Sequence, residues 1–381
     1  MGIGVNALMQ YVSDRDRIQQ TTASAGVAVI MDDPAYARSL AAANPRAVVV
    51  HRSYRDDDHR LHETVTPGDW LQSVALTAGN GVIVQALNEP SGYTNLPALV
   101  TWCVEVMKQA HERGIPLCLP NFAVGHPDTA LVESGVLDPL LRAFVAYPEM
   151  RYGCHEYWRD DPLNEPYHVG RFHAILDRCR VLGITPPRIM VTEFGRDHSG
   201  GIADGWRGVG YSEREYADLL TRTHARVYAP YGIPAAVFCY GRGADNRWAS
   251  FDVEDAETVL QTIEEYNSMT YQPGTHKLIK LPGQWLNIRA AANTSAAKVG
   301  ELRLGDVVTV VADTGDGWLQ LDRGYVSLLA GAVEFAPFTP PIPDAGTVYS
   351  EGLTDDELDQ LIKLYEGIAG IYRAVQARRA A

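Results

Sequence analysis

Lys and Arg are scarce in this chain and never gather into a basic run longer than a pair. They number 33 against 47 Asp and Glu, which gives a formal net charge of −14. Nucleic-acid binding depends on clustered Lys and Arg that neutralise phosphates. The charge balance therefore argues against a nucleic-acid partner and accommodates a neutral or cationic one more easily.

Cysteine is also scarce, and its spacing shows neither a CxxC pair nor a metal-binding pattern. The residues are Cys103, Cys118, Cys154, Cys179 and Cys239, an odd count. Three of them fall inside apolar runs, where a free thiol behaves as a small hydrophobic side chain. We expect buried free thiols rather than a disulfide framework or a zinc site, which favours a reducing compartment.

No stretch of the sequence approaches the roughly 20 apolar residues that a membrane-spanning helix needs. The first residues, MGIGVNALMQYVSDRD, lack the basic and apolar regions of a signal peptide. We expect no membrane span and no leader in the chain as given. The compartment stays open between cytoplasmic and secreted with a leader removed.

Short apolar runs recur along the first two thirds of the chain, with helix-like segments between them. They begin at Ile3, Gly26, Ala47, Gly81, Ile115, Arg151, Arg188 and Ala235. Continuous rather than alternating apolar character is typical of strands that are covered on both faces, as in a parallel sheet wrapped by helices.

Eight such strand and helix units predict an α/β fold, a closed (β/α)8 TIM barrel over residues 1–270. A doubly wound sheet is the alternative, but no GxGxxG follows the first strand.

The pattern changes over residues 276–335 to short alternating strands with Gly-containing turns. Within this segment LNIR, VGELRLGDVVTVV, GWLQL and GYVSL resemble a bacterial SH3 domain. The resemblance implies a small all-β, SH3-like barrel whose ligand is a cell wall or another protein.

The last part of the chain begins with a proline-rich segment, residues 336–352, which predicts a semi-rigid linker. A helix is expected over residues 353–379, opened by a capping box of Thr354 and Glu357. Its apolar positions repeat every seven residues, namely Leu358, Leu361, Tyr365, Ile368, Tyr372 and Val375. Two interpretations stay open: an amphipathic helix packed on the barrel, or a short coiled coil that makes the protein a homo-oligomer.

Two glutamates stand where a TIM barrel places its catalytic groups, at the C-terminal ends of strands. Glu89 follows GVIVQALN in the fourth predicted strand, and Glu193 follows RIMVT in the seventh. Glycoside hydrolysis needs one carboxylic acid to protonate the leaving oxygen and a second carboxylate to attack or to activate water. The pair therefore predicts a glycoside hydrolase, a reaction that requires no metal and no organic cofactor.

Three motifs around these glutamates resemble clan A glycoside hydrolases, especially the cellulase-like family five. They are Asn88-Glu89-Pro90, His155-Glu156-Tyr157 and Thr192-Glu193-Phe194-Gly195, on the fourth, sixth and seventh predicted strands. The resemblance implies a retaining enzyme for a β-linked oligo- or polysaccharide, with Glu89 as acid/base and Glu193 as nucleophile.

The same resemblance implies roles for the neighbouring side chains. Asn88 would hydrogen-bond the sugar 2-hydroxyl, His155 would position the acid/base pair and Tyr157 would orient the nucleophile. Glu156 alternates away from His155 and Tyr157, so we expect it to face solvent or a helix.

Further substrate-binding residues are expected around the barrel mouth. Trp248, after the eighth strand, is the candidate sugar-stacking platform, and Trp206 lies in the glycine-rich stretch after the seventh. His51 ends the third strand, where the family often has a histidine.

One departure from the family concerns an arginine that its members carry at the end of the second strand. This chain reads VIMDDP there, and Arg52 on the next strand is the candidate to replace it. The departure motivates an alternative function, a non-catalytic protein that binds glycan or cell wall on a degenerate hydrolase barrel.

Overall fold

The computed structural model describes residues 2–23, 26–55, 58–75, 77, 79, 81–90, 95–165, 167–198, 201–268, 274–281, 283–314, 318–328 and 333–337. The chain divides into two compact units, Met1–Thr339 and Pro340–Ala381, and the described residues all belong to the first. The helix predicted over residues 353–379 lies outside the described residues, as does most of the predicted linker.

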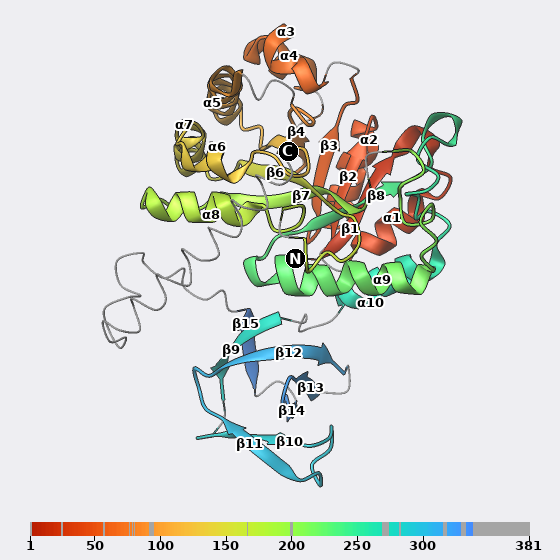
Figure 1. The fold of residues 1–381 in the computed structure, drawn as a ribbon, viewed down its shortest axis with the longest axis vertical. Helices are drawn as coiled ribbons and strands as arrows, with labels where there is room; N and C mark the ends of the chain where they lie inside the picture. Colours follow the sequence, from red (N-terminus) through yellow and green to blue (C-terminus); the bar gives the residue numbers. More distant parts are fainter. Residues whose placement is uncertain are drawn as a thin grey trace, which may run out of the picture. The chain divides into compact units, whose positions relative to one another are not determined.

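The first part of this unit is a closed barrel of parallel strands, in which each strand pairs with the next and β8 pairs with β1 (Figure 1). Its strands are β1 (Ile3–Leu8), β2 (Val27–Met31), β3 (Val48–Arg52), β4 (Ile83–Gln85), β5 (Leu117–Phe122), β6 (Arg151–Trp158), β7 (Arg188–Arg196) and β8 (Ala235–Tyr240). Each coincides with one of the predicted apolar runs, so the predicted (β/α)8 barrel is confirmed.

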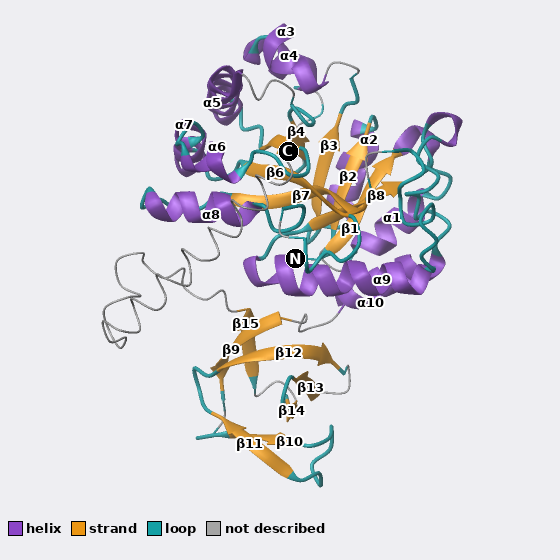
Figure 2. Cartoon of the chain, in the orientation of Figure 1, coloured by secondary structure: helices purple, strands orange, loops and turns teal. Residues whose placement is uncertain are grey.

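Helices lie around the outside of this barrel (Figure 2). The α-helices are α1 (Arg15–Thr22), α2 (Pro34–Ala43), α3 (Leu61–Thr64), α4 (Pro67–Val74), α5 (Leu96–Glu112), α6 (Thr129–Glu133), α7 (Asp138–Ala146), α8 (Phe172–Val181), α9 (Glu213–Thr223) and α10 (Glu257–Ser268). Short 3₁₀ turns are η1 (Met9–Tyr11), η2 (Asp58–Arg60), η5 (Ala229–Tyr231) and η6 (Ala244–Asn246), and η4 (His224–Tyr228) is a π-helical turn.

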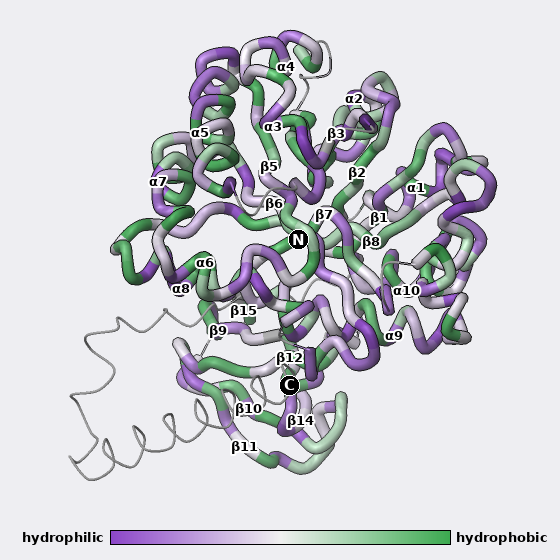
Figure 3. Tube along the Cα trace, turned by 45° about the horizontal axis from the view of Figure 1, so that its top comes forward, coloured by the Kyte–Doolittle hydropathy of each residue, from purple (hydrophilic) through white to green (hydrophobic). Residues whose placement is uncertain are grey.

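The barrel strands are buried because both of their faces are covered. Every residue of β1 is buried, and one interior cluster joins apolar side chains from β2, β3, β4, β5, β7 and β8. Figure 3 shows hydrophobic colouring along many of the strands, whereas hydrophilic colouring gathers on the surrounding helices and loops. The five cysteines are free and buried, which confirms the expectation of buried thiols.

Several helices begin where the sequence carries a capping side chain. Asp14 caps α1 by accepting from the Arg17 N–H, and Asp33 caps α2 in the same way, with Pro34 at the first helical position. Ser212 and Glu215 form a reciprocal capping box at the start of α9. These caps fix the residue at which each chain segment leaves a loop and enters a helix.

A seven-stranded sheet follows the barrel, in the order β11-β10-β14-β13-β12-β9-β15, with antiparallel pairing between the neighbouring strands. Its strands are β9 (Gly274–Lys280), β10 (Leu286–Arg289), β11 (Lys298–Leu302), β12 (Val307–Asp313), β13 (Trp318–Leu321), β14 (Gly324–Ser327) and β15 (Glu334–Pro337). Burial alternates along these strands, and the inward apolar side chains form a core of their own. The predicted small all-β domain is therefore confirmed, and β15 takes the first two residues of the segment predicted as linker.

Within the part of the chain that is described, no helix combines the length and the apolar character that crossing a membrane requires.

Candidate active site

Glu89 follows β4 at the C-terminal mouth of the barrel. Its backbone φ is 46°, a left-handed conformation that is uncommon for a residue with a side chain and that occurs most often at functional sites. The Glu89 N–H donates to the Asn121 carbonyl in β5 at 2.9 Å. The side chain is 43% exposed, so the carboxyl group is anchored through its backbone and open to the solvent side of the mouth.

Asn121 connects the two strand ends that carry the glutamates. Its side-chain amide donates to the carbonyls of Ala86 and Leu87, at 3.2 and 3.3 Å, just before Glu89. Its side-chain oxygen accepts from the Thr192 hydroxyl at 3.0 Å, just before Glu193. Because Asn121 is fully buried, these hydrogen bonds compete little with water.

Glu193 lies in β7, and its side chain is only 9% exposed. One carboxylate oxygen accepts from the Arg52 guanidinium at 2.9 Å, and the other accepts from the Tyr157 hydroxyl at 2.7 Å. Arg52, at the end of β3, is itself buried, so the ion pair is formed away from water. The structure thus places a guanidinium beside Glu193, although it comes from the third strand and not the second.

His155 lies between the two carboxylates. Its Nδ1 is 2.9 Å from a Glu89 oxygen and 3.4 Å from a Glu193 oxygen, and the ring is fully buried. The facing oxygens of Glu89 and Glu193 and this nitrogen all lie within 4.8 Å of one another. The three predicted motifs therefore meet at one point of the barrel mouth.

Tyr157 and Glu89 differ in their protonation. Burial, together with the negative charge of Glu193, raises the pKa of Tyr157 well above its usual range, so its hydroxyl stays protonated and donates. Burial also raises the pKa of Glu89, but the hydrogen bond and charge of His155 and the charge of Arg52 outweigh it. The net pKa of Glu89 is below its ordinary value, and the carboxyl is ionised at neutral pH when no substrate is present.

A pocket of about 290 Å³ opens over these groups. Polar side chains form part of its lining, and these are Arg52, Tyr54, Asn88, Glu89, Tyr157, Glu193 and Asp197. The remainder is apolar and consists of Leu8, Met31, Phe238, Trp248 and Phe251. Such a lining suits a ligand with hydroxyl groups at its edge and apolar faces.

Aromatic rings make up most of the apolar lining. The Phe238 ring packs edge-on against Trp248 at 5.3 Å and against Phe251 at 5.9 Å. Trp248, predicted as a stacking platform, thus reaches the pocket from the loop after β8. Phe238 comes from β8 itself.

Asn88 also lines the pocket, beside Glu89. Its side-chain oxygen accepts from the Gln85 amide at 3.3 Å, which holds the Asn88 amide in place.

The structure does not bring His51 or Trp206 to this pocket. His51 precedes Arg52 in β3 and is buried among charges that include Asp33 and Arg38, and burial lowers its pKa to about 4. Because successive strand residues point to opposite faces, Arg52 takes the pocket side. Trp206 is also buried, stacked on Tyr216 at 4.9 Å, and its indole N–H donates to the Phe251 carbonyl.

Glu89, His155 and Glu193 are the one group of three potential metal ligands among the described residues. A cation there would have to displace His155 from its contacts with both carboxylates. It would also lie near the Arg52 guanidinium, whose positive charge already faces Glu193. This donor set fits a hydrogen-bonded cluster of opposite charges better than a metal centre.

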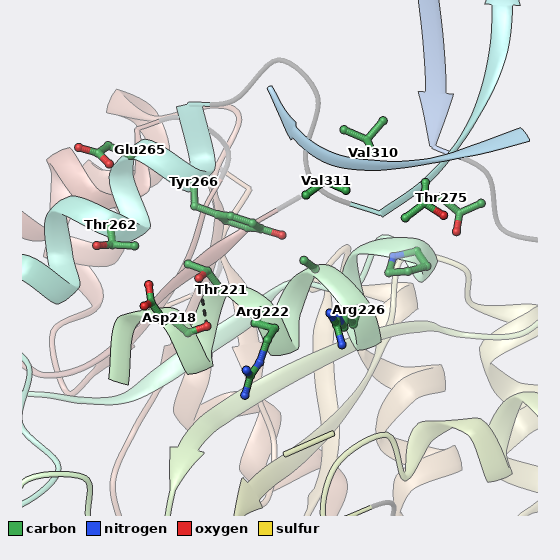
Figure 4. A pocket seen from close by; sticks show the side chains of 13 residues that line it. Asp218, Thr221, Arg222, Arg226, Thr262, Glu265, Tyr266, Thr275, Val310 and Val311 are labelled. Carbon is green, nitrogen blue, oxygen red and sulfur yellow. Dashed lines mark hydrogen bonds between the residues drawn. The ribbon is translucent and has the colours of Figure 1, made fainter. Parts of the chain in front are cut away.

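A larger pocket, of about 710 Å³, lies elsewhere in the molecule (Figure 4). Residues of α9, α10, β9 and β12 line it, among them Arg222, Tyr266, Thr275 and Val310. Neither Glu89 nor Glu193 reaches it, and volume alone does not make it the site of the chemistry.

The family model and the solved structures match different extents of the chain. Residues 286–332 match the family model of the bacterial SH3 domain, which covers the strands from β10 to β14. No curated protein sequence matches the chain.

Several solved structures are similar to the chain at low identity. A beta-mannanase from Streptomyces thermolilacinus is 17% identical over 66% of this chain and 83% of its own, with a TM-score of 0.42. An endo-beta-1,4-mannanase from Thermotoga petrophila is 13% identical over 88% and 91%, with a TM-score of 0.39. The cellulose synthase subunit Z from Clostridioides difficile is 11% identical over 69% and 99%, with a TM-score of 0.38.

Sequence reasoning missed Asn121, Phe238 and Asp197 as members of this region. Asn121 could have been recognised from the sequence, because it is a polar residue inside the apolar run LCLPNF. Phe238 could not have been recognised, since an aromatic residue in a buried strand is an ordinary core residue. Asp197 follows the TEFG motif by two residues, and a scan for polar side chains just past the strand end would have found it.

Proposed function

We propose that the barrel is a retaining glycoside hydrolase that cleaves a β-linked glycan, with Glu193 as nucleophile and Glu89 as acid/base. The observation that carries the proposal is the approach of a Glu89 oxygen to within 4.8 Å of a Glu193 oxygen across the barrel mouth. Carboxyl groups about 5 to 5.5 Å apart are typical of retaining enzymes, whereas inverting enzymes leave roughly 6.5 to 9.5 Å for a water molecule. The motifs shared with clan A, family five, agree with this assignment.

In the first step a Glu193 oxygen attacks the anomeric carbon while the bond from that carbon to the leaving oxygen breaks. Glu89 gives its proton to the leaving oxygen, and a covalent glycosyl ester forms on Glu193. In the second step Glu89 takes a proton from water, whose oxygen attacks the anomeric carbon and releases Glu193 as a carboxylate. The sugar leaves with its original anomeric configuration.

The surroundings of Glu193 suit a nucleophile. The Arg52 ion pair and the Tyr157 hydroxyl, at 2.9 and 2.7 Å, compensate its charge in a place that water hardly reaches. They also fix both carboxylate oxygens, and a fixed attacking atom lowers the entropy cost of the transition state. The Arg52 guanidinium beside Glu193 supports the catalytic interpretation over the non-catalytic alternative, which was motivated by the missing arginine on the second strand.

The surroundings of Glu89 suit a group whose protonation changes during the cycle. Its side chain is 43% exposed, so a bound glycan removes water from it and thereby raises its pKa toward the acid form. Once Glu193 is esterified its negative charge is gone, and the pKa of Glu89 falls again. The same carboxyl can then serve as base.

The SH3-like domain over residues 276–335 is proposed to attach the enzyme to a cell wall or to another protein. Tethering raises the local concentration of a polymer around the barrel. The ligand of that domain does not follow from the barrel chemistry.

The test is incubation of the purified protein with a panel of β-linked glycosides and polysaccharides, with Glu193→Gln and Glu89→Gln alongside. We expect turnover that both substitutions abolish and, by ¹H NMR of the first-formed product, retention of the β anomer. First release of the α anomer would contradict the retaining mechanism. Glycan that binds without any turnover would favour the non-catalytic alternative.

A further inference from the structure

The end of β3 supplies two residues to the catalytic pocket. Arg52, the last residue of the strand, is buried beside Glu193, and Tyr54, two residues later, lines the same pocket and is 55% exposed. Strand ends and the loops that follow them open at a low cost in free energy. The partner of the proposed nucleophile therefore lies in a segment that needs a further anchor.

Asp32, the residue after β2, bonds to this segment twice. Its own N–H donates to the Arg52 carbonyl at 2.9 Å, one position beyond the β2–β3 pair of Met31 and Arg52. Its carboxylate oxygen Oδ1 accepts from the Tyr54 N–H at 2.7 Å. The two hydrogen bonds fix the peptide groups on both sides of Ser53.

The backbone of Asp32 is set for this contact. Its φ is 60°, in the left-handed region that Asp and Asn enter more readily than other residues with a side chain. The Gln10 amide donates to the second carboxylate oxygen, Oδ2, at 3.4 Å. Both oxygens and the N–H of Asp32 thus have partners on neighbouring segments, which holds its carboxylate toward the end of β3.

A comparison with the next residue separates two kinds of contact. Asp33 caps α2 and pairs with Arg15 at 2.8 Å, which stabilises a helix start. The partners of Asp32 at the end of β3, by contrast, are the backbones of Arg52 and Tyr54, whose residues line the catalytic pocket. The two adjacent carboxylates therefore differ in what they hold.

From these contacts we infer that Asp32 is a positioning residue for the reaction, which holds Arg52 against Glu193 and Tyr54 against the substrate. The inference rests on the proposed function and adds to it a residue that acts through two others. Loss of the carboxylate releases the Tyr54 N–H and lets the end of β3 move. A displacement of about 1 Å can cost on the order of 10²-fold in rate, even when it begins away from the reacting atoms.

Three substitutions separate the hydrogen bond from the backbone conformation. Asp32→Gly removes the carboxylate, and because glycine adopts a positive φ freely, the chain can keep its course. Asp32→Asn keeps both an oxygen acceptor and a side chain that tolerates the left-handed region. Asp33→Asn is the matched control, since it neutralises the adjacent carboxylate and leaves a residue that caps a helix well.

The first measurement is kcat/KM of the full chain on 2,4-dinitrophenyl β-cellobioside and β-mannobioside. Their leaving group departs without a proton from Glu89, so the rate reports the nucleophile side. We expect Asp32→Gly to lose roughly tenfold to 10²-fold in kcat/KM. Asp32→Asn should recover most of that loss, because it restores the acceptor, and Asp33→Asn should match the wild type.

The second measurement needs no turnover. In ¹H–¹⁵N spectra of the full chain, the Arg52 Nε–H resonance, assigned by its loss in Arg52→Lys, reports the guanidinium beside Glu193. Asp32→Gly should shift and broaden this resonance, whereas Asp32→Asn and Asp33→Asn should leave it in place. Asp32→Ser, whose side chain is too short to reproduce the contact, takes the place of Asp32→Gly if the glycine variant does not fold.

Wild-type kcat/KM together with an unmoved Arg52 resonance in Asp32→Gly would overturn the inference and leave the proposed hydrolase standing. An equal loss in Asp32→Gly and Asp33→Asn would also overturn it, because both carboxylates would then act only on the turn that they share. If no glycan is turned over while the resonance moves in Asp32→Gly alone, the proposed hydrolase is wrong and the positioning of Arg52 stands.

Discussion

The two sides of the barrel mouth hold the same functional group in different ways. On the β7 side, Glu193 is 9% exposed and both of its oxygens are bonded to buried side chains. On the β4 side, Glu89 is 43% exposed and its carboxyl contacts His155. One carboxylate is fixed and compensated, and the other is accessible and can exchange a proton.

On the proposed mechanism, this difference explains how two identical residues would serve two roles. A nucleophile gains from a fixed position and a compensated charge, whereas an acid/base gains from a pKa that responds to the substrate. The proposed assignment of nucleophile and acid/base therefore rests on the environment of each glutamate and not on residue type. Single substitutions can remove the features that distinguish the two sides, one at a time.

The largest expected effect comes from removing the nucleophile. Glu193→Gln keeps the shape and the Tyr157 contact but cannot form the ester, and kcat should fall on the order of 10⁴-fold or more. Glycan should still bind. Steady-state kinetics and a binding titration check both statements. Glu112→Gln, on the exposed end of α5, serves as control and should match the wild type.

Removing the compensating charge should cost less. Arg52→Gln leaves the buried Glu193 carboxylate without its ion pair, and kcat/KM should fall roughly 10² to 10³-fold. Arg52→Lys should recover only part of the loss, since an ammonium group restores the charge without the planar fork. Activity of Arg52→Gln within twofold of wild type would show that Glu193 does not need this partner.

The Glu89 side is tested by the pH dependence of kcat/KM. His155 lowers the pKa of Glu89, and hydrolysis needs Glu89 protonated, so turnover is lost as the pH rises through that pKa. His155→Gln retains a donor but not the charge, which raises the pKa of Glu89. The alkaline limb of the profile should therefore move to higher pH. A limb that stays in place, or moves to lower pH, contradicts this account of His155.

The smallest effect is on stability, and it concerns the outer face of β6. Glu156 is fully buried there, away from solvent, and accepts from the Tyr228 hydroxyl and the Gly170 N–H, both at 2.6 Å. Burial raises its pKa to about 7 despite these hydrogen bonds. In the unfolded state Glu156 ionises at its lower, ordinary pKa, so the stability that it contributes is fully present below that pKa and is lost as the pH rises to about 7.

Glu156→Gln removes this ionisation, so the melting temperature of the variant should rise relative to wild type by several degrees between pH 5 and pH 8. Glu165 provides a control of opposite sign, because hydrogen bonds from the Asp160 and Arg159 N–H groups lower its pKa. Glu165→Gln should lose stability relative to wild type over pH values where the carboxylate is charged. Parallel behaviour of the two variants would contradict the assignment of Glu156.

The eight strands and the places of Glu89, Glu193, His155 and Tyr157 could be predicted from the sequence because they depend on local patterns. An apolar run marks a strand, and a strand end marks the mouth of a barrel. The expectation that Glu156 faces a helix or solvent followed from alternation alone, and it faces the helix side, where it meets the N–H of Gly170.

The remaining parts of the site depend on distances between strands, which a single sequence does not contain. Whether a guanidinium from the second or the third strand reaches Glu193 is decided by barrel tilt and register. His51 was expected at the mouth although its neighbour Arg52 occupies the inward position, and a strict use of alternation would have chosen between them. Trp206 lies in a loop, where no periodicity indicates which way a side chain points.

Asn121 links the two strand ends that carry the proposed catalytic carboxyl groups. Its buried side-chain amide donates to the Leu87 carbonyl, two residues before Glu89, and accepts from the Thr192 hydroxyl, one residue before Glu193. We therefore expect a displacement of β5 to carry both glutamates with it and so to preserve the gap on which the proposed retaining course depends. On the proposed mechanism, changes in the loops around the mouth would alter which sugar is accepted and leave the stereochemical course unchanged.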